Sequence, residues 1–318
     1  VQTWCSSDLF SRQNVVDQIF WVPLAGSTGA RNLLMNGGRV HTVSHEVMLY
    51  LTPVSTKNFQ WDININYAKV DNYVDELASG VESIFIGGFT IPQVRASIGD
   101  TYPVIYGISF VRGANGKVVV DDDPNSVNYG FPLIGDPDVI GSVSPDFILG
   151  GGSNLTYKRW SLNALFEWKE GGEMYSGSNG LLDFYGLSKR TEDRESTFIY
   201  DGVKSDGSPN DIVRGGPNDP FALENLHQNI LTNIDEYYIF DNSFVKLREL
   251  SLKYKPAKKL FKKVDLGVSV FARNLLIWTA LPNLDPESSQ GNTNMGGAFE
   301  RFTVPQTTSY GFNIDITF

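Results

Sequence analysis

The end of the chain, residues 306–318, alternates apolar and polar side chains almost without a break. Successive side chains of a strand point to opposite faces, so the alternation predicts an amphipathic β-strand. Its apolar face would hold Tyr310, Phe312, Ile314, Ile316 and Phe318. Its polar face would hold Ser309, Gly311, Asn313, Asp315 and Thr317. A chain that ends in such a strand is constrained to a sheet with one apolar and one polar side.

Two architectures fit a strand of this kind. In a soluble sandwich the apolar face meets a second sheet, and in a membrane barrel it meets lipid while the polar face lines the lumen. The alternation by itself is compatible with both. The position of Phe318, an aromatic residue at the very end of the alternation, is typical of bacterial outer-membrane barrels and favours the barrel.

The amino-acid composition further limits the structural class and the possible partners of the chain. No apolar run approaches the ~20 residues that a membrane helix needs, whereas barrel strands need only about 10 alternating residues each. The 31 glycines and the 13% of aromatic residues favour an all-β chain. The net charge of -10 argues against a nucleic-acid partner, since nucleic-acid binding rests on a basic surface. The single cysteine, Cys5, permits no internal disulfide.

Several further segments read as strands, separated by short turns and long loops. Strands are predicted over 2–12, 18–24, 43–51, 61–68, 102–111, 155–168, 244–255 and 264–277. Short connections are predicted over 53–57 and over 256–263, where Lys258, Lys259, Lys262 and Lys263 would form a solvated turn. Irregular polar stretches are predicted over 121–145, over 171–241 with a helical turn near 181–187, and over 279–305. Short turns at one end and long loops at the other are typical of antiparallel barrel strands.

Two strands carry more specific expectations. In the strand over 155–168, Trp160 and Trp168 bracket an apolar band, as aromatic girdles do at the two edges of the hydrocarbon layer. In the strand over 244–255, Lys246 and Arg248 share the predicted face of Leu250 and Leu252. This misfit predicts that the charged half of that strand extends beyond the lipid.

Several motifs, in order along nearly the whole chain, together resemble the C-terminal part of the SusC/RagA family of TonB-dependent outer-membrane transporters from Bacteroidetes-type bacteria. These motifs are Asn36-Gly37-Gly38 leading to Glu46, residues 140–146 followed by Gly150, residues 171–175, residues 186–191 with Arg194 and Glu195, residues 244–254, Ala272-Arg273-Asn274-Leu275, Leu284-Asp285-Pro286-Glu287, Pro305 and the terminal Phe318.

The resemblance implies a barrel of roughly 22 strands with a plugged lumen. The chain would supply about the last third of it, as a C-terminal barrel part over residues 1–318. The sequence opens at Val1 without a signal-peptide pattern, and we expect the signal peptide, the TonB-contacting segment and the plug to belong to the rest of a longer polypeptide. The resemblance also implies location in the outer membrane, TonB-driven nutrient uptake, and a SusD-like surface lipoprotein as partner.

The function that the resemblance implies is import of oligosaccharides or peptides, with no bond-breaking chemistry in this segment. An alternative remains open: a soluble, secreted all-β module that binds glycans on its aromatic side chains. The loop aromatics that would contact substrate in either case are Tyr175, Phe184, Tyr185, Tyr237, Tyr238, Phe240 and Trp278. The same residues would equally serve to pack the loops together or to form a belt at the lipid headgroups.

Other candidate residues are assigned by the same resemblance. Arg273, Asn313 and Asp315 would face the lumen, and the apolar residues of the last strand would form the C-terminal assembly signal. Relatives place a calcium-like loop before the segment at 141–145, but Asp121-Asp122-Asp123-Pro124-Asn125 lacks the glycine of such a loop. We expect no cofactor.

Metal binding and catalysis have weaker support. His41 and His45 share one predicted strand face without an identifiable third ligand, and zinc sites use three or four protein ligands. Carboxylates that invite comparison with a glycosidase pair are Asp183, Glu192, Asp193, Glu195, Asp285 and Glu287. They show no spacing signature, so the sequence predicts neither a metal site nor an enzyme.

Overall fold

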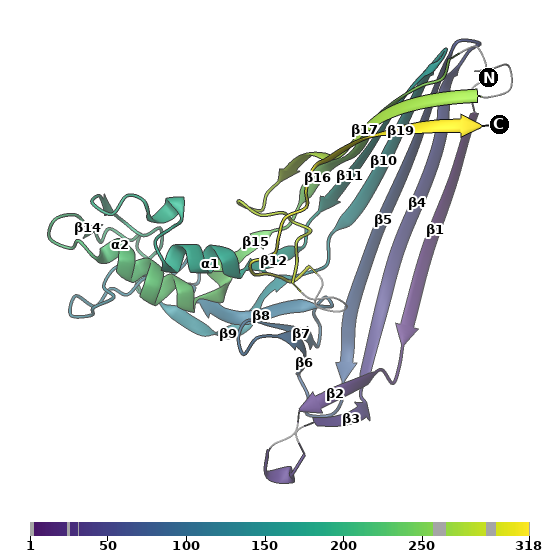
Figure 1. Ribbon diagram of the computed structural model, residues 1–318. Coiled ribbons are helices and arrows are strands. Elements are labelled where there is room, and N and C mark those ends of the chain that lie inside the picture. Colours follow the sequence, from purple (N-terminus) through teal and green to yellow (C-terminus); the bar gives the residue numbers. More distant parts are fainter. Residues whose placement is uncertain (1–2, 24–25, 31, 257–264, 291–296, 318) are drawn as a thin grey trace.

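The computed structural model describes residues 3–23, 26–30, 32–256, 265–290 and 297–317. An eight-stranded antiparallel sheet forms a tall, curved wall, and a loop domain projects from one end of it (Figure 1). The wall strands, in their order across the sheet, are β1 (Thr3–Val15), β4 (Gly38–Ser55), β5 (Phe59–Leu77), β10 (Phe147–Tyr157), β11 (Trp160–Glu170), β16 (Phe244–Tyr254), β17 (Asp265–Thr279) and β19 (Ser309–Thr317).

The first three wall strands, β1, β4 and β5, are longer than the sequence predicts. β4 and β5 have 18 and 19 residues, so β5 is about 60 Å long at ~3.3 Å per residue. The expected connection over 53–57 is wrong in its bounds, because β4 continues to Ser55 and only residues 56–58 separate the two strands. Both termini lie at the end of the wall that carries this turn (Figure 1), and the loop domain lies at the other end.

The two faces of the wall differ in chemistry. One apolar row crosses seven neighbouring strands through Val54, Trp61, Leu155, Leu162, Leu252, Val270 and Phe312. The next row, whose side chains point to the opposite face, runs through Ser55, Gln60, Thr156, Ser161, Lys253, Ser269 and Asn313. Strand register therefore turns the alternation of each segment into one continuous apolar face and one continuous polar face.

Aromatic pairs lie at both edges of the apolar face. Trp160 packs on Tyr254 with ring centroids 4.6 Å apart, and eight residues further along β11 Trp168 packs on Phe147 at 5.0 Å. Phe147 also contacts Tyr67 at 5.7 Å. Eight residues span about 26 Å of strand, which is close to the ~25 Å apolar band of outer-membrane barrels.

A β-bulge resolves the misfit of the strand over 244–255. Register shifts occur on both sides of Arg248, with respect to β11 and to β17. The extra residue reverses the alternation, so Leu250 and Leu252 stay on the apolar face while Lys246 joins the polar face with Arg248. The mixed face that the sequence predicts therefore does not form.

Two other sequence-based assignments are wrong. The segment 155–168 is not one strand: β10 ends at Tyr157 and β11 begins at Trp160, with Lys158 in the turn at a φ of 56°. The stretch 121–145 is not only turns, because it contains β9 (Ile134–Ser142), which pairs with β8 (Val104–Phe110). Its nine residues include Gly and Pro, which are unfavourable within strands, so residue propensities do not predict this strand.

The loop domain is built from the long segments between wall strands. A four-stranded sheet holds β6 (Ser83–Gly88), β7 (Gln93–Ser97), β8 and β9, and a three-stranded sheet holds β15 (Ile239–Asp241), β12 (Glu173–Ser176) and β18 (Phe299–Glu300). Two small sheets pair β2 (Ile19–Pro23) with β3 (Asn32–Asn36) and β13 (Thr197–Phe198) with β14 (Arg214–Gly215).

Helical segments complete the loop domain. They are η1 (Gly26–Thr28), α1 (Gly177–Phe184), η2 (Lys189–Thr191), α2 (Ala222–Asn225), η3 (Leu226–Ile230), η4 (Leu231–Asn233) and η5 (Asp235–Tyr238). Among the described residues, no helix has the length and apolar character that crossing a membrane requires. The helical turn expected near 181–187 corresponds to α1, which begins earlier.

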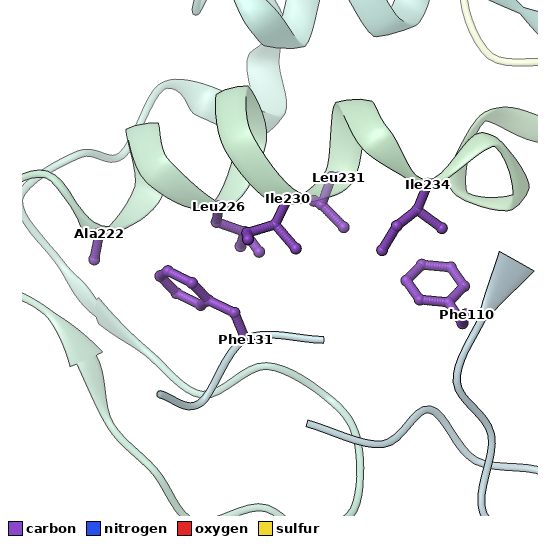
Figure 2. Close-up of a cluster of buried hydrophobic side chains, with 7 residues drawn as sticks. All are labelled: Phe110, Phe131, Ala222, Leu226, Ile230, Leu231 and Ile234. Atoms are coloured by element: carbon purple, nitrogen blue, oxygen red, sulfur yellow. The ribbon is translucent and has the colours of Figure 1, made fainter. Parts of the chain in front are cut away.

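The loop domain has its own hydrophobic core. Figure 2 shows helical residues lying against Phe110 of β8 and Phe131. The buried side chains of this cluster are Phe110, Phe131, Ala222, Leu226, Ile230, Leu231 and Ile234. Val74 and Leu77 of β5 form a second cluster with Ile84 and Ala96. The stretch expected to be an irregular loop is therefore a packed structure attached to the wall.

Candidate functional site

The loop domain contains a pocket of about 330 Å³ that brings together segments far apart in the sequence. The residues that line it are Phe89, Thr90, Ile91, Pro92, Tyr175, Gly177, Gly180, Leu181, Phe184, Thr232, Tyr238 and Arg301. They come from the β6–β7 turn, from β12, from one face of α1, from η4 and η5, and from the residue after β18. Most of this lining is apolar.

Helix α1 supplies one wall of the pocket. Gly177, Gly180, Leu181 and Phe184 follow the i, i+3, i+4, i+7 spacing of a single helix face. Ser176 caps the helix, because its Oγ accepts a hydrogen bond from the backbone N–H of Asn179 at 3.2 Å. The two glycines let other side chains approach the helix backbone closely: a Cβ on Gly177 would lie 3.3 Å from Arg301 Cγ, and one on Gly180 would lie 3.8 Å from the Tyr238 ring.

A buried carboxylate fixes the segment that carries Arg301. Glu300 is 1% exposed and accepts hydrogen bonds from Ser176 Oγ at 3.0 Å and from Ser178 Oγ at 2.7 Å. Ser178 Oγ also accepts the backbone N–H of Phe302 at 2.8 Å. These bonds hold the backbone on both sides of Arg301 against the start of α1. The Arg301 guanidinium then lies 5.3 Å from the centre of the Phe89 ring.

The tyrosines of the pocket are neutral at physiological pH. Burial, assisted by the nearby Asp235, raises the pKa of Tyr175 to about 12. Burial also raises the pKa of Tyr238, whose hydroxyl donates a hydrogen bond to Asp183 Oδ2 at 3.3 Å. Among the described lining residues, Arg301 therefore carries the single formal charge of the pocket.

A buried ion pair lies behind α1. Asp183 Oδ2 is 2.9 Å from the Arg190 guanidinium, and the carboxylate is fully buried. Burial raises the pKa of Asp183, but hydrogen bonding from His227 and the charge of Arg190 outweigh it, so that the net shift is downward. The Arg190 guanidinium also lies 5.3 Å from the centre of the Tyr237 ring. This pair joins α1 to the helical segments that follow it.

The predicted loop aromatics are brought together only in part. Tyr175, Phe184 and Tyr238 line the pocket, and Tyr185 lines a smaller neighbouring pocket of about 160 Å³ that shares Phe184. Tyr237 packs edge-on against Phe110 and Tyr238 inside the domain, and Phe240 lies in β15. Trp278 lies elsewhere, 54% exposed near the end of wall strand β17.

Neither the β6–β7 turn nor Arg301 was predicted from the sequence as part of a site. The helical spacing of Gly177, Gly180, Leu181 and Phe184 was present as a signal for one wall of the pocket. No local pattern marks Arg301, because its position depends on the parallel pairing of β18 with β12.

The residues assigned to the lumen lie on the polar face of the wall. Asp315 forms an ion pair with Lys253 and accepts a hydrogen bond from Asn313 at 2.7 Å. Arg273 contacts Glu249 on the neighbouring strand at 3.0 Å. The residues assigned to the assembly signal, Tyr310, Phe312, Ile314 and Ile316, are between 52% and 74% exposed on the apolar face. Phe318, Val264 and the predicted lysine turn lie outside the described residues.

The other candidate groups have structural partners. His41 Nδ1 lies 2.7 Å from Asp75, and His45 packs against Phe10. Asp121 and Asp123 accept hydrogen bonds within their own turn, from Ser126 and from Asn125. Within the described part of the chain, no group of three or more His, Cys, Asp or Glu side chains is arranged to hold a metal ion.

Comparison with protein-family models gave no match. Among curated proteins, the chain is similar to TonB-dependent receptor P3 of Formosa agariphila, with 25% identity over 332 residues, which covers 94% of this chain and 31% of that protein. It is equally similar to TonB-dependent receptor P26 of the same organism, with 25% identity over 94% of the chain and 31% of the relative. The chain thus spans about a third of the length of these relatives.

Solved structures show the same fold. The structure of the RagAB peptide transporter superposes with a TM-score of 0.68 at 18% identity, over 99% of this chain and 33% of that one. The RagAB peptide importer in its open-open state superposes with a TM-score of 0.69 at 17% identity. These comparisons confirm the expected resemblance to SusC/RagA-type TonB-dependent transporters. The chain is part of an antiparallel outer-membrane β-barrel.

Proposed function

We propose that the chain forms about a third of the wall, together with external loops, of a TonB-dependent outer-membrane importer of oligosaccharides or peptides. The observation that carries the proposal is the two-faced sheet, whose apolar row from Val54 to Phe312 adjoins a polar row from Ser55 to Asn313. A wall of this kind exposes one face to lipid and the other to a water-filled or plugged lumen. The similar curated proteins are receptors, not enzymes, and the proposal assigns no bond-breaking step to this segment.

The rest of the transporter would complete the barrel. In the described sheet, β1 and β19 are the two edge strands. Hydrocarbon cannot satisfy the free backbone groups of an edge, so a wall in a bilayer has to close. The remainder of the polypeptide would supply the missing strands, the plug and the segment that contacts TonB. This division agrees with the one-third coverage of the relatives.

A SusD-like surface lipoprotein would act as the lid of the importer. The loop domain projects from the end of the wall opposite the two termini (Figure 1), and this is the end at which external loops and a lid would capture ligand. Tyr175, Phe184 and Tyr238, which share one pocket, are the proposed ligand contacts in this chain. Energy transmitted through TonB would then displace the plug and let the ligand pass.

The proposal is tested on cells that make the intact protein. Outer membranes would be extracted with detergent, and the intact masses of all components that copurify with this sequence would be measured. We expect a polypeptide or a set of fragments well above 35.3 kDa, accompanied by a lipoprotein, and ligand uptake that stops when TonB is deleted. A lone chain of this mass in the soluble fraction would contradict the proposal and favour a secreted glycan-binding module.

A further inference from the structure

We infer that the loop pocket binds the C-terminal residue of a peptide, with the free carboxylate on Arg301 and an apolar side chain against α1. The inference rests on the proposed function and specifies the ligand of the same site. Two features support it: the Arg301 guanidinium, which has no ion-pair partner among the described residues, and the apolar side chains that α1 and the β6–β7 turn present to the pocket.

The backbone of Arg301 is held in place, and its side chain is exposed. Its backbone is anchored on one side by Glu300, whose carboxylate is occupied by serine hydroxyls, and on the other side by the bond from Phe302 to Ser178. A Cβ on Gly177 would lie 3.3 Å from Arg301 Cγ, so the arginine side chain runs directly over this glycine. In the described part of the chain, no acidic side chain forms an ion pair with Arg301. Its planar guanidinium suits a carboxylate, which it can bind through two parallel hydrogen bonds.

The remaining lining favours an apolar group beside that carboxylate. Phe89, Ile91, Leu181 and Phe184 present hydrocarbon to the pocket. Burying an apolar side chain against such a wall is favourable, by roughly 25 cal/mol per Å² of apolar area. The C-terminal residue of a peptide carries a carboxylate and a side chain on the same Cα, so it would fill both parts of the pocket at once. An aspartate or glutamate side chain offers the carboxylate alone.

An acidic sugar fits this pocket less well. A sugar ring brings several hydroxyl groups, and each one buried without a partner costs free energy. Two of the hydroxyls that line the pocket already donate hydrogen bonds within the protein: Tyr238 to Asp183, and Thr232 to the carbonyl oxygen of Gln228 at 2.6 Å. The pocket lining contains no carboxylate or carboxamide side chain among the described residues. The chemistry therefore favours a peptide end.

The experiment compares two ligands that differ only at this end. The intact transporter, purified with its copurifying partner, would be titrated with a five-residue peptide ending in leucine with a free carboxylate, and with the same peptide as a C-terminal amide. An oligosaccharide of uronic acids would be the third probe. We expect the free acid to bind about tenfold more tightly than the amide, as one charge-assisted contact allows.

Variants distinguish recognition of the carboxylate by Arg301 from nonspecific attraction to the positive charges of the loop domain. Arg301→Gln should remove the difference between acid and amide while leaving amide binding unchanged, and Arg301→Lys should retain part of the difference because it keeps the charge. Lys117→Gln, which removes an exposed cation elsewhere in the loop domain, should leave the acid-to-amide ratio intact. Phe184→Ala should weaken binding of both peptides. A thermal melt of each variant checks that the loop domain is folded.

Three results would overturn the inference. These are equal binding of acid and amide to the unsubstituted protein, equal weakening of both by Arg301→Gln, and dependence on Arg301 of the uronic acid probe alone. TonB-dependent peptide uptake by cells is measured in parallel. If cells import peptides but the acid-to-amide ratio is one, the inference fails and the proposed function stands. If neither uptake nor binding of any probe depends on the transporter, the proposed function fails as well.

Discussion

The ammonium group of Lys246 donates a hydrogen bond to Oδ1 of Asp285 over 2.8 Å, although the lysine side chain is only 3% exposed. Lys246 also contacts Glu287, whose second partner is Arg248 at the bulge of β16. The segment at 284–287, part of the motif that suggested the resemblance, is thereby tied to the polar face of the wall. A loop that the sequence shows only as irregular is held by a buried ion network.

Lys246→Met is expected to destabilise the folded transporter by about 3–5 kcal/mol, because it leaves the carboxylate of Asp285 buried without its cation. Lys253→Met is the matched control. Lys253 and Asp315 are 32% and 39% exposed, so losing their solvent-screened pair should cost far less. The temperature at which each variant loses its folded electrophoretic mobility measures the difference. Equal losses would show that the network does not hold the loop.

Asp235 is expected to make the stability of the loop domain depend on pH. Burial raises its pKa to about 6, well above the usual range of an aspartate, against the opposing hydrogen bond from the Ile108 N–H. The folded state therefore binds this proton more tightly than the unfolded state. Its stabilising contribution is fully present below pH 4 and is lost as the pH rises through 6, by about 3 kcal/mol at ~1.4 kcal/mol per pKa unit.

Asp235→Asn should flatten this pH dependence, since the amide oxygen still accepts the Ile108 N–H but does not titrate. Hydrogen exchange of the β8 amides at pH 4.5 and pH 7.5, corrected for the intrinsic rate at each pH, measures the opening free energy. Protection that is lower at pH 4.5 than at pH 7.5 in the unsubstituted protein would show that the sign is wrong.

Ile314→Lys is expected to prevent stable insertion, because Ile314 is 52% exposed on the apolar face. A lysine facing lipid costs about 2–4 kcal/mol near the bilayer midplane. Asn313→Lys changes the neighbouring residue on the polar face, and its effect should be mild. The yield of heat-modifiable protein in outer membranes compares the two. If both variants insert equally well, the assignment of the faces is incorrect.

Gly107→Ala is expected to displace η5 from β8. An added Cβ would lie 2.8 Å from both Cβ and Oδ2 of Asp235, and 2.8 Å from Ile140. Overpacking of this kind costs about 1–3 kcal/mol. Gly151→Ala in β10 is the control, because no atom lies within 4 Å of the added Cβ. Protease sensitivity of the loop domain should rise in the first variant alone.

The wall could be predicted from the sequence because successive side chains of each strand face lipid and lumen in turn. This alternation is visible within a single segment of the chain. It failed where the signal depends on other strands. The turn at Lys158 was missed because it spans only two residues and contains neither glycine nor proline, although the apolar positions change phase across it, from Leu155 and Tyr157 to Trp160 and Leu162. The phase reversal at Arg248 was hidden because a bulge is a property of paired strands. A single sequence does not show the bulge.

The candidate site was predictable only as a set of aromatic residues. Tyr175, Phe184 and Tyr238 share a pocket, but their grouping depends on how three distant segments pack. Trp278 has the same chemical character and lies on the wall, since exposure in a loop and exposure to lipid use the same residue types. Arg301 was missed because a lone arginine in a polar loop carries no pattern.

The separate core of the loop domain, built around Phe131 and the helices that cover it, has a consequence for how such proteins diversify. Residues that shape the pocket are supported by packing within the loops, and residues that satisfy the bilayer are supported by strand register. Substitutions that reshape the pocket therefore have little effect on the wall, and substitutions in the wall have little effect on the pocket. The pocket can therefore be remodelled by substitutions in the loops while the wall keeps its strand register.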